Sequence, residues 1–338
     1  MNSRIKLAVI LAGALSISTN SVSGEELSVA TFVPPSHETI TGALAWFENE
    51  LTSRSNGELT LKVYAAGQLG AGPTQQYKRA VEGVADITFG IAASTPTLFP
   101  KTMLAILPGK ALDGPDSTRR MWTVFDKYMA DEWSNVKVLA VGNPAGGMII
   151  ATKDVSTIEG MKGTKIVPWA AITTPVLQGM GAVPVQLDPT EHYTALSTGT
   201  IDAAISSINN IMPPWNLDEV AKYAVVNTPA TFNPVFYVMN KERYESLSAK
   251  HQKIIDEISG MPFSMQLVQA FHDADEVALK WKDEKIAAGE LNVEWIVTSD
   301  RERVKMEAAA AAGMEAIYSD YADRGIQNAR KIYEALNK

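Results

Sequence analysis

Short apolar segments and amphipathic segments alternate along the chain in the order typical of α/β proteins. Residues 27–32 form a β run that ends at Pro34 and Pro35. Residues 37–53 have apolar side chains at helical spacing and predict a helix. Residues 59–64 alternate apolar and polar side chains, as a half-buried strand does.

The later segments repeat this alternation. A predicted helix over 75–82 precedes a compact apolar strand over 86–91, which completes a first βαβ lobe. Further strands are predicted over 136–142, 148–151, 163–167, 203–206 and 236–240, and helices over 174–180 and 189–198. We expect a long helical region over 247–287 with a bend near Pro262, and more helix in residues 299–338.

The segments divide into two lobes. The chain has 338 residues, enough for about two domains of ordinary size, and contains no low-complexity linker or tandem repeat. Two lobes without a linker imply several crossings, as in binding proteins that close about a hinge. We predict an α/β fold in which 25–148 and about 235–268 form lobe I. Residues 149–234 and about 269–338 form lobe II.

The first 24 residues have the three parts of a secretory signal peptide. Arg4 and Lys6 precede an apolar run over 7–17, and small residues follow at 21–24. The apolar run is shorter than the roughly 20 residues that span a bilayer as a helix. We expect cleavage after this segment and a mature protein in the periplasm. A retained membrane anchor or a buried first helix is the alternative.

Composition argues against several classes of protein. Hydrophobic residues make up 46% of the chain and charged residues 20%, which suits packed cores. A net charge of −8 argues against a nucleic-acid partner, because phosphate binding needs a clustered positive surface. The chain has no cysteine, so disulfides, a lipid-modified cysteine and thiolate chemistry are all excluded.

The sequence also lacks the motifs of catalytic sites. The four histidines are scattered, and none forms the paired spacing of a metalloprotease helix. A nucleophile elbow, a phosphate-binding loop and a dinucleotide-binding loop are absent as well. We therefore predict a binding protein with no catalytic, metal-binding or cofactor-binding residues. An exported enzyme without a recognisable motif is the alternative.

A stretch in the second half of the chain resembles a known family. Residues 160–166 read GMKGTKI, residues 180–185 read MGAVPV, and residues 191–202 read EHYTALSTGTID. This pattern is similar to the DctP-type solute-binding proteins of tripartite ATP-independent periplasmic (TRAP) transporters. Residues 67–70 (GQLG) and 84–87 (VADI) share features with the same family.

The resemblance implies a two-lobe periplasmic binding protein with hinge strands and a long helix spanning both lobes. It implies capture of a small organic solute for membrane subunits that use an ion gradient. A binding protein that reports its solute to a membrane sensor is an alternative that the sequence does not separate from this one.

One departure from the family bears on the ligand. Most members carry an arginine after the Lys-Ile pair, whose planar fork binds the ligand's carboxylate. Here the strand continues as Val167-Pro168-Trp169. We therefore expect a small neutral or cationic solute, such as an amino alcohol. The alternative is a carboxylate held by a cation from elsewhere in the cleft, such as Arg79 or Arg119.

The candidate ligand contacts lie near strand ends and near crossings between lobes. Trp169 presents an aromatic face for a cationic or apolar group, with packing behind the strand as the alternative. Asn209 follows a predicted strand at its carboxyl end, where α/β sheets bind ligands. The full set is His37, Gln75, Trp169, Asn209, Asn210, Trp215, Phe232 and Asn233. For Glu191 we favour a structural role in the first turn of a helix.

Overall fold

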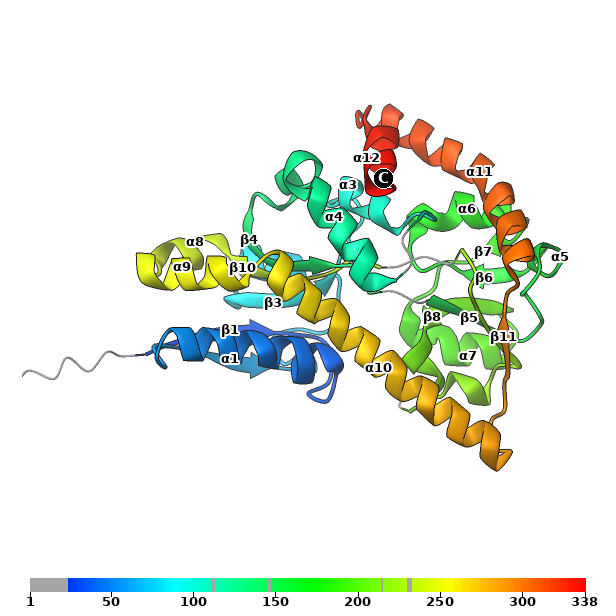
Figure 1. Cartoon of the computed structure of the whole chain (residues 1–338), viewed down its shortest axis with the longest axis horizontal. Coiled ribbons are helices and arrows are strands. Elements are labelled where there is room, and N and C mark those ends of the chain that lie inside the picture. The colour runs from blue at the N-terminus through cyan, green and yellow to red at the C-terminus, as the bar shows by residue number, and fades with distance from the viewer. Residues whose placement is uncertain (1–23, 111–112, 145–146, 214, 230–232) are drawn as a thin grey trace, which may run out of the picture.

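The protein consists of two α/β lobes bridged by one long helix (Figure 1). The computed structural model describes residues 24–110, 113–144, 147–213, 215–229 and 233–338. The predicted signal peptide therefore lies almost wholly outside the described residues. No helix in the described part of the chain is long and apolar enough to cross a membrane.

Lobe I is built on a five-stranded sheet in the order β2-β1-β3-β10-β4. The strands are β1 (Glu25–Ala30), β2 (Leu59–Tyr64), β3 (Ile87–Ile91), β4 (Val136–Gly142) and β10 (Val235–Asn240). β1 is parallel to β2 and β3, whereas β10 is antiparallel to β3 and β4. The helices are η1 (Thr39–Leu44), α1 (Ala45–Arg54), α2 (Gln76–Val81), η2 (Ala92–Ser94), α3 (Pro100–Met103), η3 (Leu104–Ile106), α4 (Gly114–Tyr128), η4 (Ala130–Trp133), α8 (Lys241–Ser246) and α9 (Ala249–Ile258).

Lobe II is built on a six-stranded sheet in the order β11-β9-β5-β8-β6-β7. The strands are β5 (Gly147–Ala151), β6 (Lys165–Val167), β7 (Val183–Pro184), β8 (Ala203–Ser207), β9 (Tyr223–Val226) and β11 (Glu294–Val297). β5 is antiparallel to β8 and β9, and the other pairs are parallel. The helices are α5 (Ile158–Met161), η5 (Ala171–Thr173), α6 (Thr174–Gly179), η6 (Pro189–Glu191), α7 (His192–Ser197), η7 (Ile208–Ile211) and η8 (Leu217–Glu219).

In each sheet, one strand follows directly on a crossing from the other lobe, and this strand is antiparallel to its neighbours. β10 follows β9, and its first residue, Val235, pairs with Ile91 at the end of β3 and Gly142 at the end of β4. β5 follows β4, and its first residue, Gly147, pairs with Ser207 at the end of β8. The parallel strands of both lobes therefore end at the boundary between the lobes, the kind of edge where α/β sheets bind ligands.

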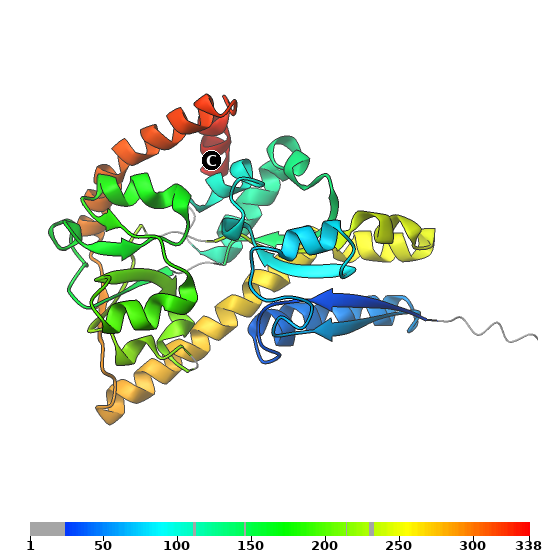
Figure 2. The same ribbon diagram turned by 180° about the vertical axis from the view of Figure 1, so that it is seen from behind.

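The C-terminal helices connect the lobes a second time (Figures 1 and 2). α10 (Met261–Ala288) packs against η1, α4 and β4 of lobe I and against η7 of lobe II. α11 (Asp300–Asp323) packs against α6, but α12 (Ala329–Leu336) packs against α4 and η3. The sequence places all of residues 269–338 in lobe II, whereas this last helix returns to lobe I.

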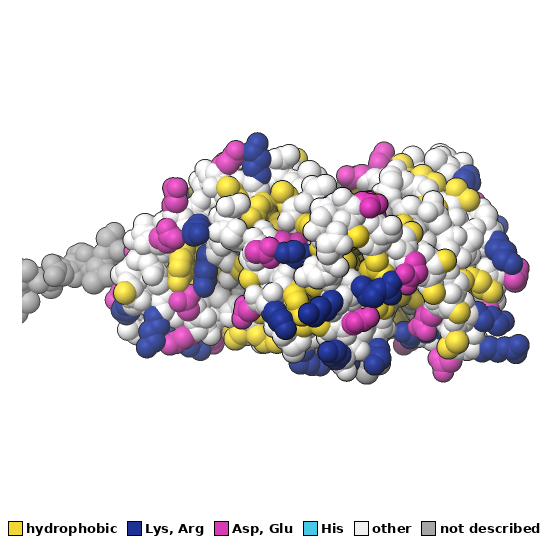
Figure 3. Space-filling model, turned by 90° about the horizontal axis from the view of Figure 1, so that it is seen from above, with side chains coloured by type: hydrophobic (Ala, Val, Ile, Leu, Met, Phe, Trp, Pro, Cys, Tyr) yellow, Lys and Arg dark blue, Asp and Glu magenta, His cyan; other side chains and the backbone are white. Residues whose placement is uncertain are grey.

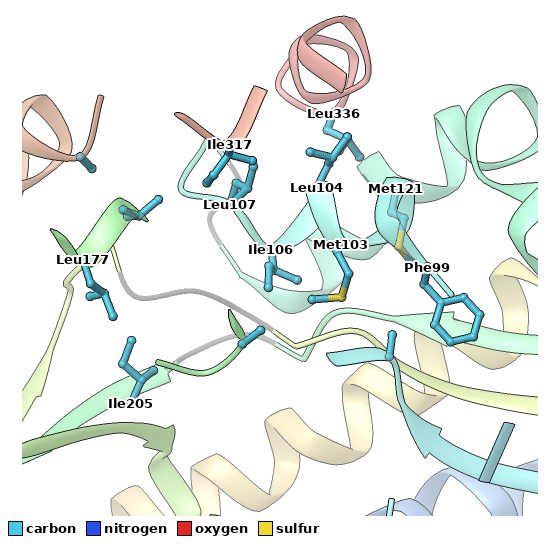
Figure 4. Packing of buried hydrophobic residues seen from close by; sticks show 14 of the residues in the cluster. Phe99, Met103, Leu104, Ile106, Leu107, Met121, Leu177, Ile205, Ile317 and Leu336 are labelled. Carbon is cyan, nitrogen blue, oxygen red and sulfur yellow. The ribbon is translucent and has the colours of Figure 1, made fainter. Parts of the chain in front are cut away.

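Buried apolar side chains of both lobes form one continuous cluster around these helices. Figure 4 shows Leu177 and Ile205 of lobe II facing Ile106 of lobe I, with Ile317 of α11 and Leu336 of α12 nearby. Burial of such side chains is the main favourable term in folding. The two lobes therefore share part of their core along α11 and α12.

Charged side chains of both signs are interspersed on the face seen from the side of α11 and α12 (Figure 3). Along α11, charged side chains form pairs one helical turn apart, such as Arg303 with Glu307 and Arg324 with Asp320. Exposed pairs of this kind add little stability each. This face is therefore a mixed, solvated surface.

The predicted bend near Pro262 is a break between two helices. α9 ends at Ile258, Gly260 adopts a φ of 72°, and α10 begins at Met261 with Pro262 in its first turn. A proline fits there because the first backbone N–H groups of a helix have no intrahelical partner. The proline thus starts the long helix rather than bending it.

The contact between α11 and α6 depends on Gly313. A β-carbon at this position would lie 2.1 Å from the carbonyl oxygen of Pro175. We expect Gly313→Ala to lower the free energy of unfolding by about 1–3 kcal/mol, although alanine is the better helix former. Urea denaturation measures this, with the exposed Ala311→Ser as control. Unchanged or raised stability in Gly313→Ala would contradict the close contact.

Candidate functional site

The candidate site lies at the boundary between the lobes, where the loop after β1 contacts the segment after β8. In lobe I, the N–H of Ala66 donates to the carbonyl of Val33 at 2.7 Å, and that of Gly67 to the carbonyl of Thr31 at 2.9 Å. These bonds hold the loop after β2 against the loop after β1. In lobe II, η7 directly follows β8.

Asn209 connects the two lobes at this boundary. Its Nδ2 donates to Oε1 of Glu38 at 3.3 Å, and Oε2 of Glu38 lies 3.4 Å from Nδ1 of His37. The backbone of Asn209 also interacts with the carboxyl group of Asp275 on α10 and favours its ionised form. The structure thus brings two predicted residues, His37 and Asn209, together through Glu38 and Asp275, which were not predicted.

Burial determines which of the side chains around Asn209 are charged. It raises the pKa of Asp275 to about 8, an effect reinforced by the charge of Glu38, and it raises the pKa of Glu38 above its usual range. Burial also lowers the pKa of His37 to about 4. Near pH 7 the imidazole is therefore neutral, and Asp275 is largely protonated. His37 can offer a hydrogen bond to a ligand but not a positive charge.

Three predicted residues carry a buried polar atom without a hydrogen-bond partner among the described residues. These atoms are Nε1 of Trp169, Oδ1 of Asn209 and Oδ1 of Asn233. Trp169 follows β6, Asn209 follows β8, and Asn233 precedes β10. An unsatisfied buried group costs about 1–3 kcal/mol, so such atoms mark positions that a ligand or water would satisfy.

The other predicted residues are less closely tied to this group. Gln75 is exposed at the start of α2, whereas the neighbouring Gln76 is buried. Nδ2 of Asn210 donates to Oγ of Ser206 at 2.8 Å, and Trp215 is 41% exposed. Phe232 lies outside the described residues.

Two further residues singled out by the sequence have structural partners. Nζ of Lys165 donates to the carbonyls of Gly199 at 3.0 Å and Thr200 at 3.1 Å, at the end of β6 opposite Trp169. Lys165 is therefore not placed to replace the missing arginine. Glu191 closes a capping box with Asp188, whose N–H donates to Oε2 of Glu191 at 3.0 Å. This is the structural role that the sequence favoured.

Known proteins match almost the whole described chain. The model of the DctP family, described as bacterial extracellular solute-binding protein, family 7, matches residues 29–320. The Outer membrane transporter protein TsaT of Comamonas testosteroni is 26% identical over 286 residues, which cover 81% of both chains. The 2,3-diketo-L-gulonate-binding periplasmic protein YiaO of Escherichia coli is 26% identical and covers 74% of this chain and 76% of its own.

Solved structures of similar proteins hold aromatic acids. A marine metagenome TRAP solute-binding protein in complex with metahydroxyphenylacetate has 25% identity and a TM-score of 0.82, covering 92% of this chain and 97% of its own. The same protein has also been solved with 3-hydroxybenzoate. A TRAP solute-binding protein of Rhodoferax ferrireducens with copurified benzoate has 25% identity and a TM-score of 0.81, covering 93% and 96%.

The partly buried Asp275 makes a testable contribution to the pH dependence of stability. The folded protein keeps this group protonated up to about pH 8, whereas the unfolded chain releases the proton near pH 4. Between these values the folded state binds more protons, so stability falls as the pH rises. We expect the melting temperature of the wild type to fall relative to Asp275→Asn between pH 5 and pH 9.

Circular dichroism melts at the two pH values measure this difference. The exposed Asp273→Asn on the same helix is the matched control and should follow the wild type. Equal pH dependence in the wild type and Asp275→Asn would contradict a protonated Asp275.

Proposed function

The chain belongs to bacterial extracellular solute-binding protein family 7, and from this premise we propose that it captures a small organic carboxylate between its two lobes. It is a periplasmic solute-binding protein of the TRAP class and not an enzyme, which confirms the predicted resemblance. We propose that the membrane subunits of a TRAP transporter receive the solute from it.

The ligands of the similar structures are the observation that carries the carboxylate proposal. The two neighbours at 25% identity were solved with metahydroxyphenylacetate, 3-hydroxybenzoate and benzoate. The expectation of a neutral or cationic solute depends on one missing arginine after β6. That absence does not decide the ligand class, because a cation on another element can hold the carboxylate. The carboxylate alternative is therefore better supported.

The partly buried aromatic side chains Phe32 and Phe271, which lie around His37 and the buried Phe89, support an aromatic acid. The ring of His37 lies 6.4 Å from that of Phe89 and 6.0 Å from that of Phe271, and Phe32 stacks on Phe89 at 5.7 Å. Trp169 adds an indole at the end of β6. Aromatic rings pair favourably at such separations, by about 0.5–1.5 kcal/mol.

The orientation of Asn209 favours a hydroxyl group on the ligand. Because its Nδ2 donates to Glu38, the free atom of the amide is the acceptor Oδ1. An ionised carboxylate has no proton to donate to this oxygen, whereas a hydroxyl does. A hydroxylated aromatic acid would satisfy both Oδ1 of Asn209 and the N–H donor of Trp169.

A ligand panel tests the proposed function. The panel contains 3-hydroxybenzoate, benzoate, mandelate and glucuronate, with 3-hydroxybenzamide as the uncharged match and ethanolamine as an amino alcohol. At about 100-fold excess over Kd, a ligand stabilises the folded state by roughly 2.7 kcal/mol, so thermal denaturation detects it. We expect an acid to give the largest shift. A larger shift with ethanolamine or the amide would contradict carboxylate capture.

Trp169→Phe tests the indole N–H separately from the ring. The phenyl ring retains an apolar face, but the donor is lost, so we expect Kd for 3-hydroxybenzoate to rise about five- to tenfold in isothermal titration calorimetry. Loss of the donor itself should not lower stability without ligand, because Nε1 has no partner among the described residues; any decrease then reflects the lost packing of the larger indole against the core. Lys165→Met, at the opposite end of β6, is the control and should leave Kd unchanged. Wild-type affinity in Trp169→Phe would show that the indole N–H does not bind the ligand.

A further inference from the structure

Three arginines in the described part of the chain form no ion pair with a carboxylate: Arg79, Arg119 and Arg301. Arg119 and Arg301 are exposed, so water solvates their charge. Arg79 is partly buried, and its Nη1 is buried without a hydrogen-bond partner. A guanidinium group stays charged at any physiological pH, so Arg79 is a cation without an ion-pair partner among the residues that the structure describes.

The loop after β2 holds the guanidinium of Arg79 in place. Its Nη2 donates to the carbonyl of Ala71 at 3.3 Å. The group lies against Gly70, where a β-carbon would be only 2.1 Å from Nη2. Gly70 has a φ of 126°, a conformation that side chains rarely allow. Any residue other than glycine at this position would displace the guanidinium.

This loop is part of the boundary between the lobes. Its residues Ala66 and Gly67 bond to the loop that follows β1, and that loop leads to His37 and Glu38. The guanidinium therefore lies on the side of the sheet where β1 and β2 end. Arg79 belongs to α2 and lies three residues after Gln76, the first residue of that helix.

We propose that Arg79 binds the carboxylate of the ligand, in place of the arginine that other family members carry after β6. This inference rests on the proposed capture of an organic acid. His37 is neutral near pH 7, and Lys165 is bonded to backbone carbonyls. A carboxylate would give the buried Nη1 a charged acceptor, and Arg–carboxylate hydrogen bonds are among the strongest in proteins.

Arg79→Gln tests the proposal through discrimination between charged and neutral ligands. Isothermal titration calorimetry, with competition for weak binding, gives the Kd values of 3-hydroxybenzoate and 3-hydroxybenzamide. We expect the preference for the acid over the amide to fall by about tenfold or more, as loss of a hydrogen bond to a charged group predicts. Arg79→Lys should retain part of the preference, and the exposed Arg119→Gln all of it.

The outcomes separate this inference from the proposed function. If the wild type binds the acid and Arg79→Gln keeps the full preference for it, Arg79 is not the carboxylate partner, although acid capture stands. If the variant loses affinity for acid and amide in equal proportion, Arg79 has only a structural role. If the wild type binds no acid of the panel, both the proposed function and this inference fail.

Discussion

The exchange of one strand between the lobes is the constraint on which the site depends. β10 enters lobe I and β5 enters lobe II. Each strand begins at the boundary between the lobes and is antiparallel to its neighbours. The neighbouring strands must therefore end where the exchanged strand begins. The segments that carry His37, Trp169, Asn209 and Asn233 all lie next to these ends, although they are far apart in the sequence. The strand order alone therefore places the segments of the site next to one another.

Asn209 both holds the two lobes in position and determines which hydrogen-bonding atom faces the site. Its backbone and side-chain donors face Asp275 and Glu38, which belong to α10 and lobe I, while its acceptor Oδ1 stays unpaired among the described residues. Removal from water raises the pKa of both carboxyl groups, and the charge of Glu38 raises that of Asp275 further, so placing the two partly buried groups here carries a cost. Buried polar atoms without hydrogen-bond partners are more common at functional sites than elsewhere, and here such atoms occur at the boundary between the lobes.

The sequence predicted several strands well because their hydrophobic pattern is local. The predicted bounds 59–64 and 136–142 are those of β2 and β4. Other local patterns are ambiguous: an Asp-Gly pair such as Asp113-Gly114 is typical of a turn, but here Oδ1 of Asp113 accepts from the N–H of Asp116 and caps the start of α4. Such a pair suits a turn and a helix cap equally well. Glu38 and Asp275 were missed because charged residues on helical segments are typical of solvated faces, and only the packing of α10 buries them.

The central claim is that an organic acid binds between the strand ends of the two lobes. A crystal structure of the protein with the panel acid that binds most tightly tests this directly. The account predicts electron density for the acid at the boundary, with its carboxylate against Arg79 and its ring near Trp169 and Asn209. Density for the acid within one lobe or on the outer surface, with the boundary residues unchanged, would contradict the account.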